Sequence, residues 1–477
     1  MTDLVLSTGA VRGTSSNGIH RFLGIPYAAA PVGAQRFAAP EPHAPWNDIR
    51  DASEFGATAP QAPYAGTIGE LLPTVAIEGD EFLNANVWTP DGAHGLPVMV
   101  WVHGGSFAHG ANALTGYDGT TFARDGVVLV SINYRLGAEG FSVLEGAPLN
   151  LGLADVAAAL RWVQREAVAL GGDPARVTVF GESAGAILIG ALLASPDAGS
   201  LFSQAIMESG MATAAPAAKA GRITREMAKR LGVPATREAF AQIPAERLVE
   251  TQTEVTAGST PLTGGASFAL AEGDELIPAA PFGALLAGAG DDIPLLVGST
   301  TEEYRLWFVP TGLMERISAP LFAAARLRFR IGRRILAAYR TRAPHASRGE
   351  LFGMLATDIL LRLPINRLAD ARRAHGARTW VYEFAWQSPV QQLGAAHAME
   401  IGFVFDGLSE VDWSGLVGPD APQQLADDMH GAWVRFATTG DPGWEAWSAD
   451  RPVQIFDAPA SGVVNAPREQ ERASWGH

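Results

Sequence analysis

A Gly-x-Ser-x-Gly pentapeptide places a serine where a nucleophile could act. Gly-Glu-Ser-Ala-Gly at 181–185 directly follows a short apolar run at 176–180 and directly precedes an apolar helical segment at 184–193. A serine on such a strand-to-helix turn is held in a strained conformation that exposes its hydroxyl, and the flanking glycines let neighbouring backbone approach. The helix N-terminus also favours negative charge that develops nearby. Ser183 is therefore the candidate nucleophile.

A second glycine-rich segment could donate hydrogen bonds to an oxyanion. His-Gly-Gly-Ser at 103–106 closes an apolar run at 96–102. Glycines let successive N–H groups point the same way, and a tetrahedral intermediate needs such donors. The N–H of Ala184, just after the candidate nucleophile, would be a further donor. A phosphate-binding loop is the competing interpretation, but no Gly-Lys-Ser/Thr follows.

A serine hydroxyl needs a base to take its proton, and ten histidines compete for that role. In the chain order Ser, acid, His, the base lies well downstream of the nucleophile. His397 meets that condition in a loop of small residues before an apolar run. His345 and His375 lie near arginines, which disfavour protonation of the ring, and His430 fits a surface helix. With an ordinary histidine pKa of about 6.5, activity would rise from about pH 5 toward 8.

The acid that would orient such a histidine has two candidates. The apolar run 293–298 is typical of a late sheet strand, and Glu302 and Glu303 follow it shortly afterwards. The carboxyl ends of parallel strands are where α/β sheets keep their sites. An ionised carboxylate there would fix the histidine tautomer and stabilise the imidazolium. The pattern alone does not separate the two glutamates.

Alternating apolar runs and helical segments indicate the fold that positions these residues. The runs at 96–102, 126–133 and 176–180 are short and continuous, as in strands buried on both faces, while 154–170 has helical spacing. This rhythm predicts a mainly parallel sheet with crossover helices.

Composition limits the remaining classes of function. The chain has 477 residues, of which 47% are hydrophobic, so it is long and apolar enough for a large core. Its net charge of −15 argues against nucleic-acid and membrane-surface partners. The chain contains no cysteine, which excludes disulfides, thiolate metal sites and a cysteine nucleophile. We expect no signal peptide and no spanning segment.

One basic segment stands apart from this acidic balance. Residues 318–350 are predicted to be largely helical and carry the following arginines: Arg326, Arg328, Arg330, Arg333, Arg334, Arg340 and Arg342. Such a cluster raises the question of nucleic acid. No aromatic stacking platform accompanies it, so we expect a solvated helix face.

Several motifs, taken in order, resemble those of the type B carboxylesterase family, which includes bacterial para-nitrobenzyl esterases and cholinesterases. The resemblance covers nearly the whole chain. It rests on Phe-Leu-Gly-Ile-Pro-Tyr-Ala at 22–28, Pro-Val-Gly at 31–33, Arg-Phe at 36–37, Asn-Val-Trp-Thr-Pro at 86–90, His-Gly-Gly at 103–105, Asn-Tyr-Arg-Leu-Gly at 133–137, Asn-Leu-Gly-Leu at 150–153, Gly-Gly-Asp-Pro at 171–174, the pentapeptide at 181–185, Ser-Gly at 209–210, His-Ala-Met-Glu at 397–400 and Phe-Ala at 436–437.

The resemblance implies a role for each candidate residue. Counted from Gly298 in the family's Gly-x-x-x-Asp-Glu-Gly motif, the acid falls on Glu303, although Tyr304 replaces the following glycine. The oxyanion donors fall on Gly105 and Ser106, where serine replaces the usual glycine or alanine. Phe82 replaces a half-cystine of the family, as expected for a bacterial member without disulfides.

The sequence as a whole is interpreted as a serine carboxylesterase on an α/β-hydrolase fold, with a large, mostly parallel central sheet flanked by helices. We expect one catalytic domain over 1–477, with helical insertions at about 215–290 and 305–390 around the active-site mouth. The expected catalytic residues are Ser183, Glu303 and His397, and the expected oxyanion donors are Gly105, Ser106 and Ala184. Candidate pocket residues, for each of which core packing is an equal alternative, are Phe107, Trp307, Phe308, Met399 and Ile401.

Other classes of function stay open beside this interpretation. The same triad would serve a carbamate, amide or thioester hydrolase, and the family also contains binding proteins that have lost the nucleophile. The expected partner is a small ester substrate. No metal or organic cofactor, nucleic acid or membrane is implied, and we expect a cytoplasmic monomer.

Overall fold

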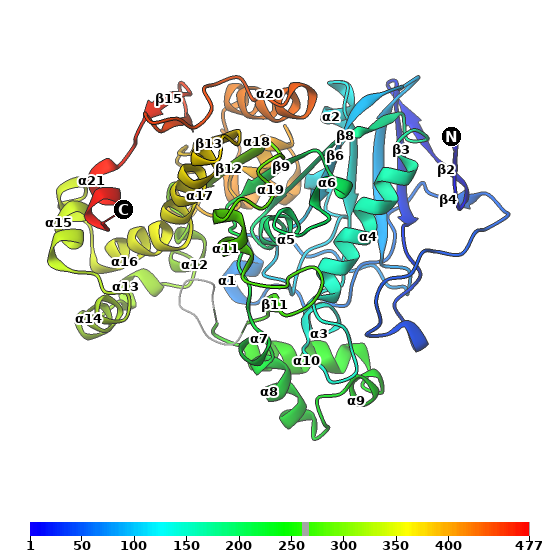
Figure 1. Ribbon diagram of the computed structural model, residues 1–477, viewed down its shortest axis with the longest axis horizontal. Helices are drawn as coiled ribbons and strands as arrows, with labels where there is room; N and C mark the ends of the chain where they lie inside the picture. Colours follow the sequence, from blue (N-terminus) through cyan, green and yellow to red (C-terminus); the bar gives the residue numbers. More distant parts are fainter. Residues whose placement is uncertain (260–266, 477) are drawn as a thin grey trace.

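The structure is a computed structural model that describes residues 1–259 and 267–476, and a large sheet runs through its centre (Figure 1). Within these residues the sheet has 13 strands in the order β1-β2-β3-β5-β7-β6-β8-β9-β12-β13-β14-β15, with β4 beside β2. The strands are β1 (Thr2–Leu6), β2 (Gly9–Ser16), β3 (Ile19–Pro26), β4 (Arg50–Asp51), β5 (Asn84–Pro90), β6 (Leu96–Val102), β7 (Val128–Ile132), β8 (Gly172–Glu182), β9 (Gln204–Glu208), β12 (Leu295–Thr300), β13 (Thr379–Phe384), β14 (Pro452–Phe456) and β15 (Gly462–Asn465).

Neighbouring strands from β7 through β6, β8, β9, β12 and β13 to β14 all pair in parallel. The remaining pairs toward the two edges are antiparallel, apart from β2 with β4. The predicted mainly parallel sheet is thus confirmed. Because β6, β8 and β12 run in the same direction, the residues that follow them emerge at one edge of the sheet.

Strand β6 shows why these apolar runs form central strands. Val98, Val100 and Val102 pack into one hydrophobic cluster, whereas Met99 and Trp101 pack into another. All five side chains are fully buried, as the two-residue period of a strand requires when both faces are covered.

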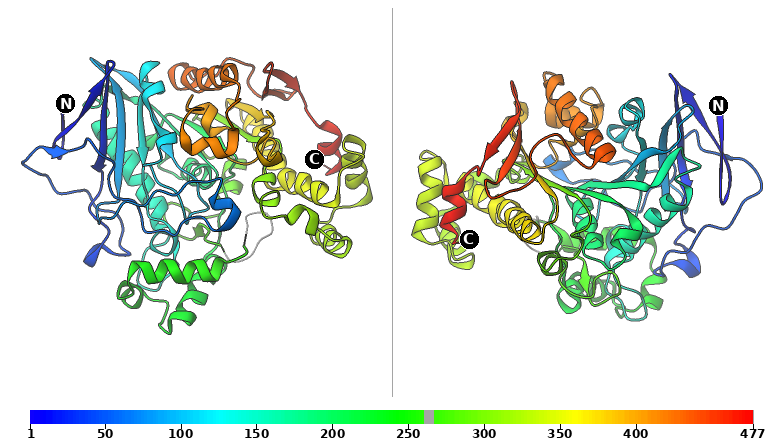
Figure 2. Two further views of the ribbon diagram at one scale, coloured as in Figure 1. Left: turned by 180° about the vertical axis from the view of Figure 1, so that it is seen from behind. Right: turned by 45° about the horizontal axis from the view of Figure 1, so that its top comes forward.

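Helices cover both faces of the sheet (Figure 2). One cluster includes side chains of α4 (Leu151–Glu166) and α5 (Ala184–Leu193). The other includes side chains of α2 (Thr120–Arg124), α18 (Ile401–Val404) and α20 (Gln423–Thr439). The helices predicted at 154–170 and 184–193 are confirmed as α4 and α5, the first displaced by a few residues toward the N-terminus.

The two predicted insertions contain mainly helices. In the first lie α7 (Ala217–Ala220), α8 (Arg222–Leu231), α9 (Arg237–Ala241), α10 (Ala245–Thr256) and α11 (Pro281–Leu286), with a small sheet of β10 (Ala215–Pro216) and β11 (Ala271–Glu272). Residues 260–266 of this insertion lie outside the described residues. In the second lie α12 (Arg305–Phe308), α13 (Leu313–Arg316), α14 (Ala319–Arg328), α15 (Arg333–Arg342), α16 (Arg348–Thr357) and α17 (Leu363–Ala374). β13, which also falls in the second predicted range, is a strand of the central sheet.

Helices α14 to α16 enclose a third, smaller hydrophobic cluster of their own. In Figure 1 they lie at one end of the molecule, beside α21 (Glu469–Ser474). Across the described ranges, no helix has both the length and the apolar character needed to cross a bilayer.

Candidate active site

The turn between β8 and α5 holds Ser183 in a conformation that side chains rarely adopt. Its φ is 54° and its ψ is −117°, and its N–H donates to Glu208 O at 2.9 Å. A Cβ at Gly181 would lie 2.4 Å from Val102 O, and one at Gly185 only 2.0 Å from the same atom. Both glycines are therefore needed for β6 to pass this close to the turn, and Ser183 stays half-buried at the edge of the sheet.

His397 and Glu303 meet at the same edge. His397 Nδ1 lies 2.5 Å from Glu303 Oε2, and the backbone N–H of His397 donates to Glu303 O at 3.4 Å. The other carboxylate oxygen of Glu303 accepts a hydrogen bond from the N–H of Thr300 at 2.8 Å. The glutamate is fully buried and its two oxygens both have partners, so it fixes the orientation of the imidazole.

Glu302 takes a different direction. Its carboxylate lies 3.4 Å from Arg305 Nε and accepts from the N–H of Ala395 at 3.3 Å. The structure therefore brings Glu303, and not Glu302, to the imidazole. Tyr304, which replaces the family's glycine, packs so closely against α16 that a Cβ at Gly353 would lie 2.1 Å from its ring. The substitution at 304 is thus accommodated by a glycine on a neighbouring helix.

Glu182 is a functional candidate that the sequence analysis missed. Its Oε1 lies 2.9 Å from His397 Nε2, on the side of the ring opposite Glu303. Within the described residues, no hydrogen bond joins Ser183 Oγ to His397. The imidazole of His397 thus lies between the carboxyl groups of Glu182 and Glu303, one beside each ring nitrogen. The position of Glu182 beside Ser183 in the pentapeptide was the available clue.

The two carboxylates change the proton affinity of the ring. Burial alone would lower the pKa of His397, but Glu182 and Glu303 together raise it well above its ordinary value of 6.5. Burial also raises the pKa of Glu182, against the opposing effect of His397. His397 acts as a base only when its ring is neutral. The acid limb of the pH–activity profile should therefore lie at a higher pH than a histidine with an unshifted pKa would give.

Replacing Glu182 with glutamine should move that acid limb to lower pH. Removing one negative charge makes the imidazolium less stable, so neutral His397 becomes available at lower pH. The measurement is kcat/KM against pH for a short-chain p-nitrophenyl ester. Glu302→Gln is the matched control and should leave the limb where it is. An unchanged limb in Glu182→Gln would show that this carboxylate does not set the pKa of the base.

The loop after β6 offers free backbone donors beside Ser183. Gly105, Ser106 and Phe107 have φ values of 112°, 54° and 64°. Within the described chain, no hydrogen-bond acceptor faces the N–H of Gly105 or Ser106. A Cβ at Gly104 would lie 3.2 Å from Ser183 Cβ, which places this loop against the candidate nucleophile.

His103 and Ala184 complete the surroundings of this loop. His103 stacks on Tyr134 with ring centroids 4.5 Å apart, and Tyr134 donates to its carbonyl at 2.9 Å. Burial lowers the pKa of His103 to about 4, so its ring stays neutral and anchors the loop. Ala184 is the first residue of α5, where a helix leaves its N–H groups without intrahelical partners.

Two more buried carboxyl groups belong to Glu208 and Glu400. Trp433 Nε1 donates to Glu208 Oε1 at 2.7 Å, and Ser209 Oγ donates to Glu400 Oε1 at 2.7 Å. Burial raises the pKa of Glu208 to about 8 and raises that of Glu400 well above its usual range. Both groups therefore favour the protonated form at neutral pH, which limits the negative charge around Glu182 and Glu303.

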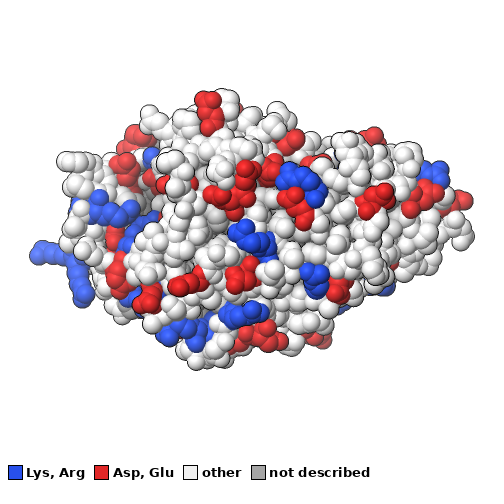
Figure 3. Space-filling view, turned by 90° about the horizontal axis from the view of Figure 1, so that it is seen from above, with Lys and Arg blue, Asp and Glu red and all other residues white. Residues whose placement is uncertain are grey.

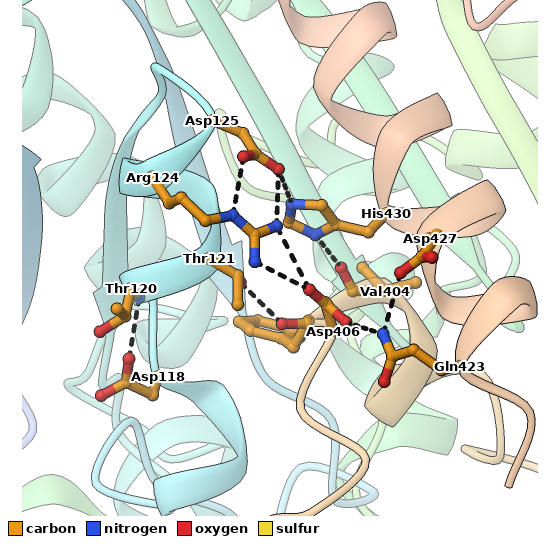
Figure 4. Close-up of polar contacts among 11 residues, drawn as sticks. Asp118, Thr120, Thr121, Arg124, Asp125, Val404, Asp406, Gln423, Asp427 and His430 are labelled. Carbon is orange, nitrogen blue, oxygen red and sulfur yellow. Dashed lines mark hydrogen bonds and ion pairs between the residues drawn. The ribbon is translucent and has the colours of Figure 1, made fainter.

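The chain that follows His397 is fastened by polar contacts from α2 and α20 (Figure 4). His430 Nδ1 lies 2.8 Å from Val404 O, and its Nε2 lies 3.1 Å from Asp125 Oδ2. Arg124 bridges Asp125 and Asp406, at 2.8 Å and 3.2 Å. His430 is buried in this contact and does not lie on the surface face that the sequence predicted. These contacts hold α18 in place, and with it the end of the loop that contains His397.

The five candidate pocket residues fall into two groups. Trp307 is half-buried and its ring lies 4.7 Å from that of His397, so it covers the imidazole. The other four are buried in hydrophobic clusters or against neighbouring rings: Phe107, Phe308, Met399 and Ile401. An aromatic pair that no sequence pattern indicated, Tyr64 and His109, stacks with ring centroids 4.2 Å apart. The backbone N–H of His109 donates to Gly105 O at 2.9 Å, so the pair borders the loop that follows β6.

The described residues contain no group of three or more His, Cys, Asp or Glu side chains placed to hold a metal ion. What the arrangement does contain is a serine at a strained turn, an imidazole oriented by a buried carboxylate, and free backbone donors opposite the serine. These are the components of nucleophilic acyl transfer.

Comparison with known proteins identifies the family. The profile of the Carboxylesterase family matches residues 2–455. The chain belongs to the carboxylesterase family. The para-nitrobenzyl esterase of Bacillus subtilis is 35% identical to it over 99% of this chain and 98% of that protein. Phenmedipham hydrolase of Pseudarthrobacter oxydans is 34% identical over 94% of this chain and 93% of the relative. The resemblance drawn from the motifs is thereby confirmed.

Solved structures of this carboxylesterase family agree with the fold. The carboxylesterase of Geobacillus stearothermophilus superposes with a TM-score of 0.88 at 33% identity, covering 100% of both chains. A para-nitrobenzyl esterase structure gives a TM-score of 0.85 over 99% of both chains. The predicted α/β-hydrolase fold is confirmed, and the chain is a carboxylic ester hydrolase of this family.

Proposed function

We propose that this esterase works through Ser183, His397 and Glu303, with an acyl-enzyme intermediate on Ser183. The observation that carries the proposal is the 2.5 Å contact between His397 Nδ1 and buried Glu303, at the sheet edge where Ser183 sits on its strained turn. Glu303 holds the ring so that Nε2 is left to act on a proton at the serine. In the structure Nε2 lies 2.9 Å from Glu182 Oε1, so a hydrogen bond between Ser183 Oγ and Nε2 has to replace that contact in each reaction.

Acylation follows from this geometry. Neutral His397 takes the proton of Ser183 Oγ as the oxygen attacks the ester carbonyl carbon. The negative charge that forms on the carbonyl oxygen is bound by the N–H groups of Gly105, Ser106 and Ala184. The imidazolium then gives its proton to the alkoxide oxygen as the C–O bond breaks, and the alcohol leaves with the acyl group on Ser183.

Deacylation repeats the same steps with water. His397 takes a proton from water as its oxygen attacks the acyl carbonyl, and the same N–H groups bind the oxyanion. Collapse of the intermediate releases the carboxylic acid and returns the proton to Ser183 Oγ.

The proposal also covers the oligomeric state and the cellular compartment of the enzyme. Every proposed site residue comes from one chain, so a single copy should suffice for activity, as one domain with insertions. Because the chain contains no cysteine and has Phe82 in place of the family's half-cystine, we assign it to a reducing compartment, the cytoplasm.

A panel of three substrate types tests the substrate class. We expect the highest kcat/KM with short-chain p-nitrophenyl esters and far lower values with the matching p-nitroanilides. Phenmedipham belongs in the panel because one relative is named for its hydrolysis. If an amide or phenmedipham were turned over better than every ester, the second candidate, an amide or carbamate hydrolase with the same triad, would replace the first.

A further inference from the structure

The second insertion carries a large excess of positive charge in an acidic protein. Residues 316–349 contain nine arginines and no aspartate or glutamate, whereas the whole chain has a net charge of −15. The arginines are Arg316, Arg326, Arg328, Arg330, Arg333, Arg334, Arg340, Arg342 and Arg348. Charge segregation of this kind creates a local potential opposite in sign to that of the rest of the molecule.

Most of this charge is not neutralised within the chain. Arg342 pairs with Glu471 at 2.5 Å. In the part of the chain that the structure describes, the other eight have no carboxylate within ion-pair distance, and three of them donate only to backbone carbonyls. Elsewhere in the described chain many arginines do pair with acids, as in the buried pair of Arg135 and Asp155 at 2.6 Å, although Arg176 and Arg237 also donate only to backbone carbonyls.

Large apolar side chains are exposed among these arginines. Leu327 is 83% exposed, Leu321 50% and Phe329 38%. All three belong to α14 or the turn after it, where the chain reads Arg-Leu-Arg-Phe-Arg at 326–330. Phe322 points inward to the cluster that α14 to α16 enclose, so the exposed residues are not required for that cluster. α14 therefore presents leucine and phenylalanine to solvent, bordered by unpaired arginines.

These residues lie at one end of the molecule, where α14 and α15 project from the body (Figure 1). The space-filling view shows basic side chains projecting at that end (Figure 3). We call the exposed residues of this end the arginine patch: Leu321, Leu327, Arg328, Phe329, Arg330, Arg333 and Arg334.

We propose that the arginine patch docks this esterase on an anionic lipid surface. Arginines bind headgroup phosphates, while the interleaved Leu327 and Phe329 can enter the boundary between headgroups and acyl chains. The pattern suits lipid better than nucleic acid, because one exposed phenylalanine offers no row of rings for stacking bases. The sequence analysis predicted a solvated face and no membrane partner. The pairing and exposure seen in the structure now favour contact with a membrane surface, without a spanning helix.

The patch is physically joined to the active site. α12 carries Trp307, which covers His397, and its Phe308 stacks on Phe352 of α16 at 5.9 Å. Tyr304, next to Glu303, packs on Gly353 of the same helix. A surface that docks on α14 and α15 therefore lies against the insertion that carries part of the active-site wall, where esters dissolved in that surface could be taken up.

Vesicle binding tests the proposal without relying on turnover. The full-length protein is mixed with vesicles of phosphatidylcholine alone and of phosphatidylcholine with phosphatidylglycerol, and the bound fraction is measured by sedimentation at low and high salt. We expect binding only to the anionic vesicles, weakening as salt rises. The triple variant Arg328→Gln/Arg330→Gln/Arg333→Gln should bind about a hundredfold more weakly, since each arginine near such a surface contributes about fivefold.

A matched control uses exposed cations on two other helices, α7 and α8. Lys219→Gln/Arg225→Gln/Lys229→Gln removes the same charge near α8 and should bind like the unchanged protein. Leu327→Ser should also weaken binding, which a purely electrostatic attraction would not show. All variants should keep the thermal unfolding temperature and hydrolyse soluble esters normally. Equal loss in both triple variants, no binding to anionic vesicles, or binding to a soluble nucleic acid in preference to vesicles would each overturn the proposal.

Discussion

Replacing Ser183 with alanine should lower kcat for a short-chain p-nitrophenyl ester by about 10⁵-fold to 10⁶-fold, as loss of the nucleophile does in other serine hydrolases. The expected loss is this large because the acyl-enzyme route needs the hydroxyl at the strained turn, and the oxyanion donors alone recover only a small part of the rate. The measurement is single-turnover and steady-state hydrolysis with purified protein.

Ser200→Ala is the matched control for this loss. Ser200 is exposed on the short helix α6 (Ala198–Leu201), and its hydroxyl bonds only to Asp197 O. Its removal should leave kcat unchanged. Near-normal activity in Ser183→Ala would mean that some other group carries the acyl transfer.

Replacing Glu303 with glutamine should lower kcat by about 10³-fold to 10⁴-fold, comparable to the loss when the acid of such a triad becomes an amide. Glutamine keeps the shape but removes the charge that stabilises the imidazolium and selects the tautomer. The hydrogen bond of Glu303 to the N–H of Thr300 is retained in the variant, so the fold should persist.

Glu302→Gln is the control variant for Glu303→Gln. Glu302 is adjacent in sequence, yet it contacts Arg305 and Ala395 and not the imidazole. We therefore expect its activity to stay within about threefold of the unchanged protein, the scale of a partly exposed ion pair. The opposite ranking of the two variants would assign the acid to Glu302.

The elements that hold the site were predictable because strong local patterns specify them. The apolar runs that became β6 and β12 are buried on both faces, and the glycines around Ser183 permit one close approach to β6. Such patterns depend on neighbours in sequence and on sheet geometry, so they can be interpreted without knowledge of distant contacts.

Residues whose role depends on distant contacts could not be resolved in this way. Glu302 and Glu303 have the same chemistry one position apart, so their local pattern left both open. The family resemblance placed the acid on Glu303, and the structure brings that residue to His397. Glu182 was visible in the pentapeptide, but its contact with His397 spans more than two hundred residues of chain. The sequence does not distinguish an apolar residue buried in the core from one that lines the site. Among the five pocket candidates, Trp307 is the one whose ring packs on the imidazole of His397.

In the arginine-rich segment, too, the sequence did not show which charges are paired in the folded protein. The sequence identified the cluster and predicted a solvated face, because composition does not tell which arginines meet a carboxylate. The structure separates Arg342, which is paired, from Arg328, Arg330 and Arg333, which are exposed beside Leu327.

Covalent labelling tests the assignment of the nucleophile most directly. The protein is treated with a fluorophosphonate, and its intact mass and tryptic peptides are measured. We expect one adduct per chain, located on Ser183, with loss of esterase activity in proportion to labelling and no adduct in Ser183→Ala. Inactivation with the label on another residue, or an unlabelled Ser183 in fully inactivated protein, would contradict it.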